Sequence, residues 1–481
     1  MKQVPDPSAA VKLPKILDIR PAVAPPLDPG FRPPVLALRQ YRRAVERAGG
    51  GLPLVIGVER ENGLLSRFET RVLAPGKKPD GATLYLVERL IKFLLWSRGG
   101  WKIHFGGPRA IGEYIRECYG AGGLRAFDAR VMGEDVYGKT FAVDLCAAED
   151  VPPAREMGAA LGGHLDGCRV GFDLGASDYK IAAVRDGKAV FTEEIPWNPK
   201  DQPDPEYHYR HVREGLRKAA AHLPRVDAIG GSSAGIYINN QVKIASLFRS
   251  VPKELFDRKV KNMFLDLQRE WGVPLEVIND GEVTALAGTM SLGETAMLGV
   301  AMGSSQAGGF LNREGHIPGW LDELAFTPVD FNPQAAGDEW SGDRGVGALY
   351  FSQQAVNKLA PAACYSFPET TGLPERLKEI QAKAEAGDTE ALGIFETIGV
   401  YLGYTIPLYA EFYDYDHLLI LGRVTSGRGG DLILEKAQSV FKSEFPELAD
   451  RIEVNVLDEE HRRVGQAVAA ASLPELKKGE K

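Results

Sequence analysis

The sequence predicts a two-lobed α/β fold preceded by an additional amino-terminal α+β domain. With 481 residues, the chain is too long for one hydrophobic core, because such cores stop growing at roughly 250 to 300 residues. From about residue 168 onward, short apolar strands alternate with helical patterns, as they do in α/β domains. The preceding residues have predicted helices and strands of their own. We therefore expect two or three domains.

Composition and charge exclude several kinds of protein. Hydrophobic residues make up 44% of the chain and charged residues 25%, close to the averages for soluble globular proteins. The formal net charge of −8 provides no overall attraction to nucleic acid or to an anionic membrane. No uninterrupted apolar stretch approaches the roughly 18 residues of a membrane-spanning helix, and no hydrophobic signal segment follows Lys2. We expect a cytoplasmic protein that binds neither nucleic acid nor a membrane.

The amino-terminal part divides in two. Residues 1–36 carry repeated prolines and little hydrophobic periodicity, which predicts an extended arm that wraps a neighbour or stays mobile. Residues 37–165 predict a separate α+β unit, which the sequence does not connect with a function. Its expected elements are a helix at 35–47, a hairpin of strands 52–58 and 64–72, and helices near 82–98 and 109–119.

The helix near 82–98 contains the densest apolar cluster of the chain, at Phe93 to Trp96. Charged residues surround this cluster at helical spacing, namely Glu88, Arg89, Lys92 and Arg98. This pattern predicts an amphipathic helix with one buried face.

The two lobes are expected at residues 166–285 and 286–481. Strands at 170–173, 179–184 and 189–195 predict a β-meander that opens the first lobe. Helices near 206–222 and 252–270 then alternate with strands at 228–229 and 275–278. The last helix, at 463–473, is rich in alanine and is expected to pack back on the core.

Four segments carry residues suited to phosphate chemistry. The first runs from Asp173 through Gly175 and Ser177 to Lys180, between two predicted strands. An aspartate at a strand end can hold Mg²⁺ through water, and a glycine-containing turn lets backbone amides approach phosphate oxygens. Lys180 can add positive charge. An ordinary hairpin with a solvated lysine would use the same residues.

In the second segment, a buried strand delivers Asn279 and Asp280 to the start of a helix. A carboxylate at this place can take the proton from an attacking alcohol. Asn and Asp are also the residues preferred at a helix start, and the local sequence alone favours that capping role.

The third and fourth segments are short, small-residue loops after apolar strands. Gly303, Ser304 and Ser305 offer amides and hydroxyls to phosphate oxygens, and Gly422 ends a strand where an adenosine can lie at the sheet edge. Ordinary turns without a ligand would contain the same small residues. The order of the four segments is more informative, because it is that of the phosphate, connecting, second phosphate and adenosine segments of the actin-like ATPase (ribonuclease H-like) fold.

The resemblance extends to a family. Residues from about 168 to 475 resemble the ROK family (repressors, open reading frames, kinases). Further matching stretches are Gly319 to Phe326, similar to the family's G-x-x-G-E-I-G-H, and Ser341 to Gly347, Ala386 to Asp388 and Val464 to Ala470. The resemblance implies ATP-dependent phosphorylation of a hydroxyl on a sugar or related polyol, with ATP and Mg²⁺ as cofactors and a homodimer as the expected assembly.

The resemblance also implies residue roles. Asp280 corresponds to the catalytic base, Asn279 to a sugar ligand, and Glu323 to a carboxylate that binds the sugar. Asp173 would face Mg²⁺ through water. The residues expected around the nucleotide are Gly175, Ser177, Lys180, Gly303, Ser304, Ser305 and Gly422, and those expected in a loop near the sugar are Gly230, Gly231, Ser233 and Gly235.

One departure from the family pattern bears on function. Phe326, Ser341 and Val346 stand where the family has zinc ligands, so we expect no zinc site. Since that metal supports the loop that presents the sugar ligands, its loss argues against a standard hexose kinase activity.

The alternative function is that of a non-catalytic sugar sensor, because some family members are transcription factors. The extension contains no convincing helix-turn-helix and is not markedly basic. A scaffold with a degenerate pocket is less consistent with the presence of Asp173, Asn279, Asp280 and Glu323.

Overall fold

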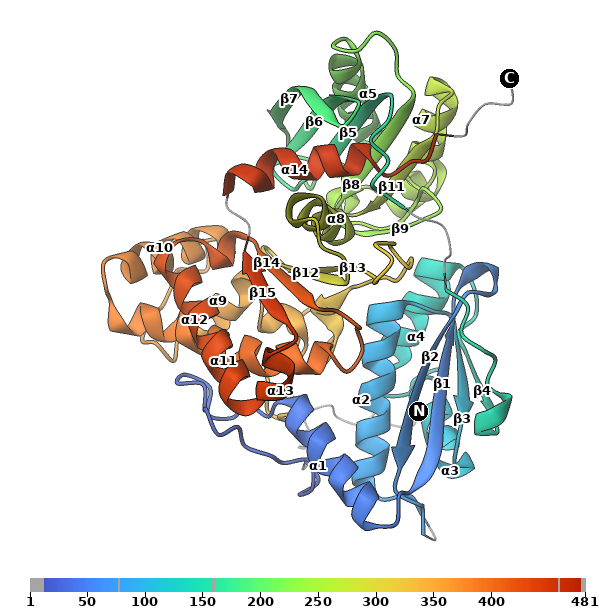
Figure 1. Ribbon diagram of the computed structural model, residues 1–481, viewed down its shortest axis with the longest axis vertical. Coiled ribbons are helices and arrows are strands. Elements are labelled where there is room, and N and C mark those ends of the chain that lie inside the picture. Colours follow the sequence, from blue (N-terminus) through green and yellow to red (C-terminus); the bar gives the residue numbers. More distant parts are fainter. Residues whose placement is uncertain (1–12, 77, 157–160, 457–458, 477–481) are drawn as a thin grey trace.

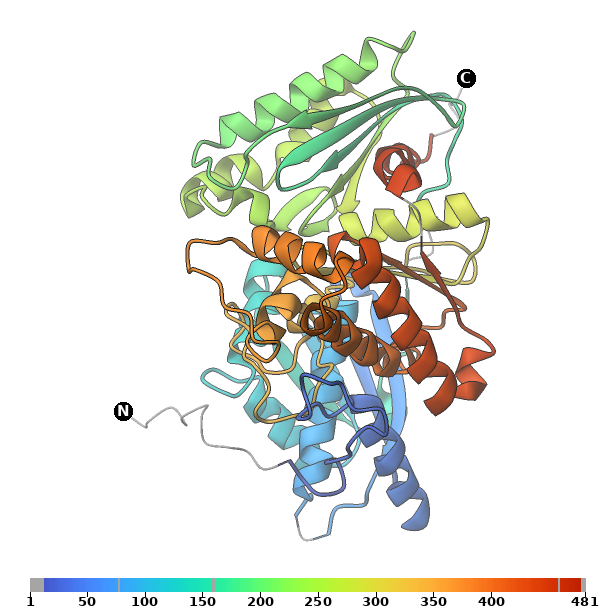
Figure 2. The same ribbon diagram turned by 90° about the vertical axis from the view of Figure 1, so that its left-hand side faces the viewer.

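The computed structural model describes residues 13–76, 78–156, 161–456 and 459–476. Three larger β-sheets and a two-stranded one organise this part of the chain (Figure 1). The sheet formed after residue 168 lies at one end of the molecule, and the sheets of the amino-terminal and carboxy-terminal parts lie toward the other end, as a view from the side also shows (Figure 2).

The amino-terminal unit is a four-stranded sheet covered by helices. Its strand order is β2-β1-β3-β4, and only β3 and β4 pair in parallel. The strands are β1 (Leu52–Glu59), β2 (Leu65–Val72), β3 (Lys102–Gly106) and β4 (Ala142–Cys146). The helices are α1 (Pro34–Arg47), α2 (Gly81–Arg98), α3 (Arg109–Cys118) and α4 (Ala126–Arg130), which continues into the π-helical η2 (Val131–Tyr137). The predicted hairpin and helices of this unit are thus present.

The first lobe has a five-stranded sheet in the order β11-β8-β5-β6-β7. An antiparallel meander continues into two strands parallel to β5. The strands are β5 (Cys168–Leu174), β6 (Asp178–Arg185), β7 (Lys188–Pro196), β8 (Ala228–Ser233) and β11 (Leu275–Asn279), with a separate hairpin of β9 (Ile236–Ile238) and β10 (Gln241–Ile244). The helices are α5 (Pro205–Ala220), α6 (Lys253–Leu255), η5 (Phe256–Val260) and α7 (Met263–Trp271), so the single helix expected near 252–270 is interrupted.

The second lobe is built on the sheet β13-β12-β14-β15. Its strands are β12 (Met297–Met302), β13 (Gln306–Leu311), β14 (His417–Leu421) and β15 (Glu453–Val456). Helix α8 (Asp280–Leu292) lies between the two lobes and contacts both β11 and β12. The other helices are α9 (Gln353–Leu359), α10 (Leu373–Glu385), α11 (Thr389–Tyr409), α12 (Gly427–Glu444) and α13 (Pro446–Ala449).

The chain ends on the first lobe, which corrects our assignment of all residues 286–481 to the second. Helix α14 (Glu459–Ala471) contacts β5, β6 and β8. Two glycines of that sheet permit the approach: a Cβ on Gly171 would lie 1.8 Å from the carbonyl oxygen of Ala467, and one on Gly230 would lie 1.7 Å from that of Ala470. A side chain at either position would therefore push the helix away from the sheet.

The amino-terminal unit is not packed as a separate domain, in contrast to our expectation. Its buried residues belong to the same hydrophobic core as those of the second lobe. The ring of Phe93 on α2 stacks on that of Phe412, with centroids 3.7 Å apart. The arm belongs to this core too, because Leu17 and Phe31 are buried and the Tyr401 hydroxyl donates to Asp28 Oδ2 over 2.5 Å. The part of the arm before residue 13 lies outside the described residues.

One helix differs from its sequence-based interpretation, and another is long and apolar. Helix α2 is not amphipathic with one buried face, because Glu88, Arg89, Lys92 and Arg98 are all buried. Within the described residues, α11 is the helix long and apolar enough to cross a membrane. Its most apolar window is 83% buried inside the protein, as expected of a core helix.

Candidate functional site

A cleft of about 750 Å³ contains most of the predicted acceptor residues. Its walls come from the start of α8, the β12–β13 turn and the segment from Ala234 to Phe256. Glu323 and Phe326 add a further wall. The amino-terminal unit also reaches the cleft, through Trp96 at the end of α2 and Asp135 of η2.

Asn279 turns the chain from β11 into α8. Its Oδ1 accepts a hydrogen bond from the Gly281 N–H over 2.7 Å, and the Glu282 carboxylate accepts one from the Asn279 N–H over 3.3 Å. Together with a bond from the Glu282 N–H to the Asn279 side chain, the second of these bonds forms a capping box, so the capping interpretation is confirmed. The Asn279 Nδ2 donates to the carbonyl of Gly235 over 2.8 Å, which ties the helix start to the wall of the cleft. Asp280 therefore enters the cleft on a rigid support.

The Asp280 carboxyl is half-buried at the first turn of α8. Burial and the negative charge of Asp173 raise its pKa to about 6, although nearby backbone N–H groups and Lys180 act in the opposite direction. A carboxylate with such a pKa is ionised near neutral pH and is a stronger base than an exposed aspartate.

Asp173 lies near the end of β5 and is 6% exposed. Its Oδ1 accepts a hydrogen bond from the Ser232 hydroxyl over 2.7 Å, and its Oδ2 lies 3.3 Å from Lys180 Nζ. Two carboxylates, those of Asp173 and Asp280, thus influence one another across the end of the sheet, with Lys180 as the nearby cation. This set of hard oxygen donors fits Mg²⁺, held through water.

Glu323 differs from Asp280 in its protonation. Burial, followed by the charges of Asp280 and Asp322, raises the pKa of Glu323 to about 8. At neutral pH its carboxyl is therefore mainly protonated and can donate a hydrogen bond. Its backbone is fixed by the amino-terminal unit, since the Glu323 N–H donates to the carbonyl of Trp96 over 3.0 Å.

The expected nucleotide residues fall into two groups. Gly303, Ser304 and Ser305 line the cleft at the β12–β13 turn, which is closed by a hydrogen bond from the Gly303 N–H to the Ser305 carbonyl over 2.9 Å. The expected residues outside the cleft lining are Gly175, Ser177, Lys180 and Gly422, and Asp173 lies outside it as well. Gly175 and Ser177 form the exposed β5–β6 turn, and Gly422 follows β14 with a φ of 115° and packs against the Met302 backbone.

Three of the residues expected near the sugar, Gly230, Gly231 and Ser233, do not line the cleft, and Gly230 packs against Ala470 of α14. Gly231 lies inside β8, where an added Cβ would come within 2.1 Å of the Phe172 ring. Ser233 is buried and its hydroxyl lies 2.6 Å from that of Tyr237. Strand β8 extends to Ser233, so the loop begins later than the sequence suggested. Of the four expected residues only Gly235 lines the cleft, beside Ala234.

The residues at the expected zinc positions have other roles. Phe326 packs against Trp96 and Trp340, with ring centroids 4.5 and 4.9 Å away. The Ser341 hydroxyl donates to Asp338 Oδ2 over 2.7 Å, and Val346 is fully buried. Among the described residues, no group of three His, Cys, Asp or Glu side chains is arranged to hold a metal ion directly.

Sequence reasoning missed Trp96, Asp135 and Trp340, which line the cleft from outside the matching motifs. Trp96 is the last residue of the apolar cluster in the α2 segment, and this cluster is the only feature of the sequence that draws attention to it. Nothing in the sequence around Asp135 indicates a site, and Trp340 directly precedes the matching stretch that begins at Ser341.

Comparison with solved structures connects this geometry with known proteins. One match is a ROK family transcriptional regulator described as a homolog of the E. coli MLC protein, with a TM-score of 0.52 and 18% identity over 64% of this chain and 78% of that one. Another is a ROK hexokinase from Thermus thermophilus, with a TM-score of 0.50 and 18% identity over 63% of this chain and 97% of that one. The chain has the ROK fold. No protein-family model matches the sequence, and comparison with curated proteins finds no match.

The expected resemblance is thus confirmed at the level of the fold. One ROK-fold match is an enzyme and the other a regulator, so the ROK fold is compatible with both roles. The choice between them depends on the residues in the cleft.

Proposed function

We propose that the protein is an ATP-dependent carbohydrate kinase that phosphorylates a hydroxyl of a sugar or related polyol. The observation that carries this proposal is the position of Asp280. It lies in a 750 Å³ cleft, its pKa is raised to about 6, and the Gly303–Ser305 turn lines the same cleft from the other lobe. Phosphoryl transfer requires mainly alignment of the reactants and neutralisation of charge, and this arrangement offers both.

In this proposal Asp280 accepts the proton of the attacking hydroxyl. Its carboxylate is fixed by the capped start of α8, so little reorganisation is needed at the moment of transfer. The protonated Glu323 donates a hydrogen bond to an oxygen of the acceptor and thereby orients it. Asn279 contributes the second N–H of its amide, since the first is bonded to Gly235.

The nucleotide side of the cleft is proposed at the β12–β13 turn. The hydroxyls and backbone amides of Ser304 and Ser305 are exposed there and can donate to phosphate oxygens. Asp173 would hold Mg²⁺ through water, and this ion would neutralise negative charge on the phosphates. Lys180 already pairs with Asp173 and adds positive charge at the same place.

A second candidate is a sugar sensor without catalysis. It is favoured by the hydrogen bonds and the ion pair that Asn279 and Asp173 already form with other groups of the protein. The Asn279 Oδ1 and Nδ2 are both bonded to backbone groups, and each oxygen of Asp173 already has a partner in Ser232 or Lys180. Such residues can support the fold of a pocket that binds sugar without reacting.

A panel of sugars and polyols, incubated with ATP and Mg²⁺ and coupled to ADP release, distinguishes the two candidates. The kinase predicts turnover with at least one acceptor, and Asp280→Asn should lower kcat by roughly 10²- to 10⁴-fold while leaving nucleotide affinity unchanged. Glu276→Gln is a matched control, because Glu276 lies on β11 with a raised pKa but outside the cleft lining. Sugar binding without turnover would identify the sensor.

A further inference from the structure

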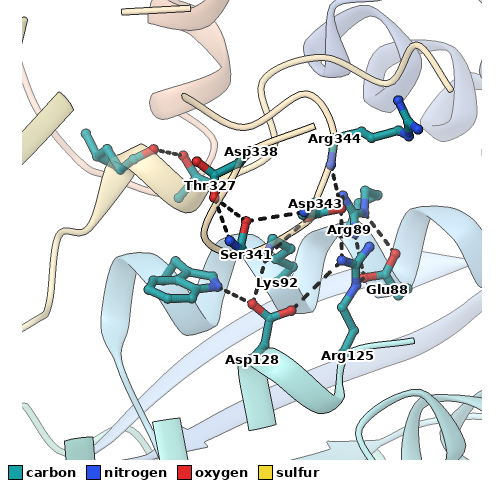
Figure 3. Close-up of polar contacts among 12 residues, drawn as sticks. Glu88, Arg89, Lys92, Arg125, Asp128, Thr327, Asp338, Ser341, Asp343 and Arg344 are labelled. Carbon is teal, nitrogen blue, oxygen red and sulfur yellow. Dashed lines mark hydrogen bonds and ion pairs between the residues drawn. The ribbon is translucent and has the colours of Figure 1, made fainter. Parts of the chain in front are cut away.

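The loop after Glu323 returns to the amino-terminal unit and enters a buried cluster of charges (Figure 3). Asp343 of this loop is 10% exposed and contacts three cations of that unit. Its carboxylate oxygens lie 3.1 Å from Arg89, 3.2 Å from Lys92 and 2.9 Å from Arg125. Arg89 and Lys92 come from α2, and Arg125 precedes α4. One loop carboxylate thus joins two elements of the amino-terminal unit.

The cluster is complete and nearly balanced in charge. Glu88 pairs with Arg89 over 2.8 Å and also contacts Arg125, while Asp128 lies 2.7 Å from Lys92. Three carboxylates therefore face three cations in the interior. Burial alone would raise the pKa of Asp343, but Arg89 and Lys92 hold it below its usual value. An uncompensated charge in the interior is strongly unfavourable. Asp343 therefore stays with its three cations and holds the loop against the amino-terminal unit.

The start of the loop is held by the end of α2. Helix termini leave carbonyl groups without helical partners. Here the Asp322 N–H donates to the Ser97 carbonyl over 2.9 Å, and the Glu323 N–H donates to the Trp96 carbonyl over 3.0 Å. The segment 322–346 is therefore anchored to the amino-terminal unit at both ends.

Trp340 lies between these two anchors and faces the cleft. It is 45% exposed, yet three rings brace it: those of Phe326, Phe127 and Trp96, with centroids 4.9, 5.0 and 6.0 Å away. Trp96 in turn donates from Nε1 to Asp128 Oδ1 over 2.7 Å, which couples the aromatic group to the charge cluster. A braced, exposed indole offers a flat apolar surface to a ligand.

We propose that the amino-terminal unit completes the acceptor subsite, with Asp343 as a positioning residue for Glu323 and Trp340 as a specificity-determining residue. The acceptor assignment rests on the proposed function. The anchoring of segment 322–346 does not, and it can be tested separately. All three expected zinc positions, Phe326, Ser341 and Val346, fall in this segment.

The test compares Asp343→Asn and Trp340→Ala with Glu411→Gln in the full chain. Glu411 pairs with Arg42 of α1 and so links the amino-terminal unit to the second lobe, and neither residue belongs to the cleft lining. Hydrogen exchange of segment 322–346 should accelerate about tenfold in Asp343→Asn and stay unchanged in Glu411→Gln. Exchange in β5 and β6 should be the same in all three variants.

Calorimetry with glucose, mannose and N-acetylglucosamine, and separately with Mg²⁺ and AMPPNP, measures the consequence for binding. Asp343→Asn and Trp340→Ala should weaken binding of the sugar at least about tenfold and change nucleotide affinity less than about twofold. An equal loss of affinity for sugar and for nucleotide, or unchanged exchange in segment 322–346, would overturn the inference.

If no sugar binds the wild type, the proposed function loses its support, and the exchange result still decides whether Asp343 anchors the segment. Should Asp343→Asn not fold, the pattern in Trp340→Ala decides alone.

Discussion

Asp173 near the end of β5 and Asp280 at the start of α8 share the end of one sheet, where burial and the charge of Asp173 raise the pKa of Asp280 to about 6. The parallel pairing of β5, β8 and β11 produces this relationship, because parallel strands end at the same edge. Residues more than a hundred positions apart thereby act on one another. The same relationship makes the proposed chemistry sensitive to pH.

The pH dependence of kcat/KM should be bell-shaped. Asp280 must be ionised to accept a proton, so activity should rise as the pH increases through about 6. Glu323 must be protonated to donate its hydrogen bond, so activity should fall as the pH increases through about 8. Steady-state rates measured from about pH 5 to pH 9.5 test both limbs. Glu323→Gln keeps a donor at all pH values and should remove the alkaline limb; a fall above pH 8 that persists in this variant would assign that limb to another group.

Lys180→Met should move the acid limb to higher pH. The positive charge of Lys180 lowers the pKa of Asp280, whereas burial and the charge of Asp173 raise it. Removal of the lysine should therefore raise the pKa of Asp280. The lysine also pairs with Asp173 over 3.3 Å, and a tenfold or smaller fall in kcat, about 1.4 kcal/mol, should accompany the shift. The comparison of pH profiles for wild type and Lys180→Met measures this effect. An acid limb at the same pH in both would show that Asp280 does not control it.

Much of the fold was predictable because its signals are local. Alternating apolar residues located the β5–β7 meander, and the Asn279–Asp280 pair after an apolar strand located the β11–α8 junction. The order of these segments predicted the actin-like ATPase fold, and the resemblance of residues 168–475 pointed to the ROK family, which the structural comparison supports at the level of the fold. Gly231 and Ser233 were misplaced because the sequence does not show that β8 continues to Ser233.

The contribution of the amino-terminal unit was not predictable from local patterns. Charged residues on a helix normally face solvent, so Glu88, Arg89 and Lys92 indicated an exposed face of α2. Their partners Arg125, Asp128 and Asp343 are distant in sequence, and single residues of this kind carry no motif. The same applies to Trp340, which becomes a wall of the cleft only when the loop folds back onto Trp96.

Substitution of Gly171 by alanine should destabilise the protein. The new Cβ would lie 1.8 Å from the Ala467 carbonyl oxygen, so β5 and α14 would have to separate. Overpacking of this kind costs about 1–3 kcal/mol, measured as a lower midpoint in urea unfolding. Gly81→Ala is a useful control, since a Cβ there meets nothing within 4 Å and Gly81 is the first residue of α2. A Gly171→Ala variant as stable as Gly81→Ala would contradict the close contact of α14 with the sheet.

Removal of residues 1–156 should yield an insoluble protein. The deletion would expose the apolar surface of the second lobe that α2 covers, including Phe412, whose ring stacks on Phe93. A milder change, Phe93→Ala, should lower the free energy of unfolding by about 3–5 kcal/mol, as is typical for a buried phenylalanine. Phe191→Ala serves as the control, because Phe191 packs at the edge of the separate core of the first lobe. A soluble, monodisperse fragment with cooperative unfolding would show that the two lobes fold without the amino-terminal unit, and the shared core would then be an interface rather than a requirement for folding.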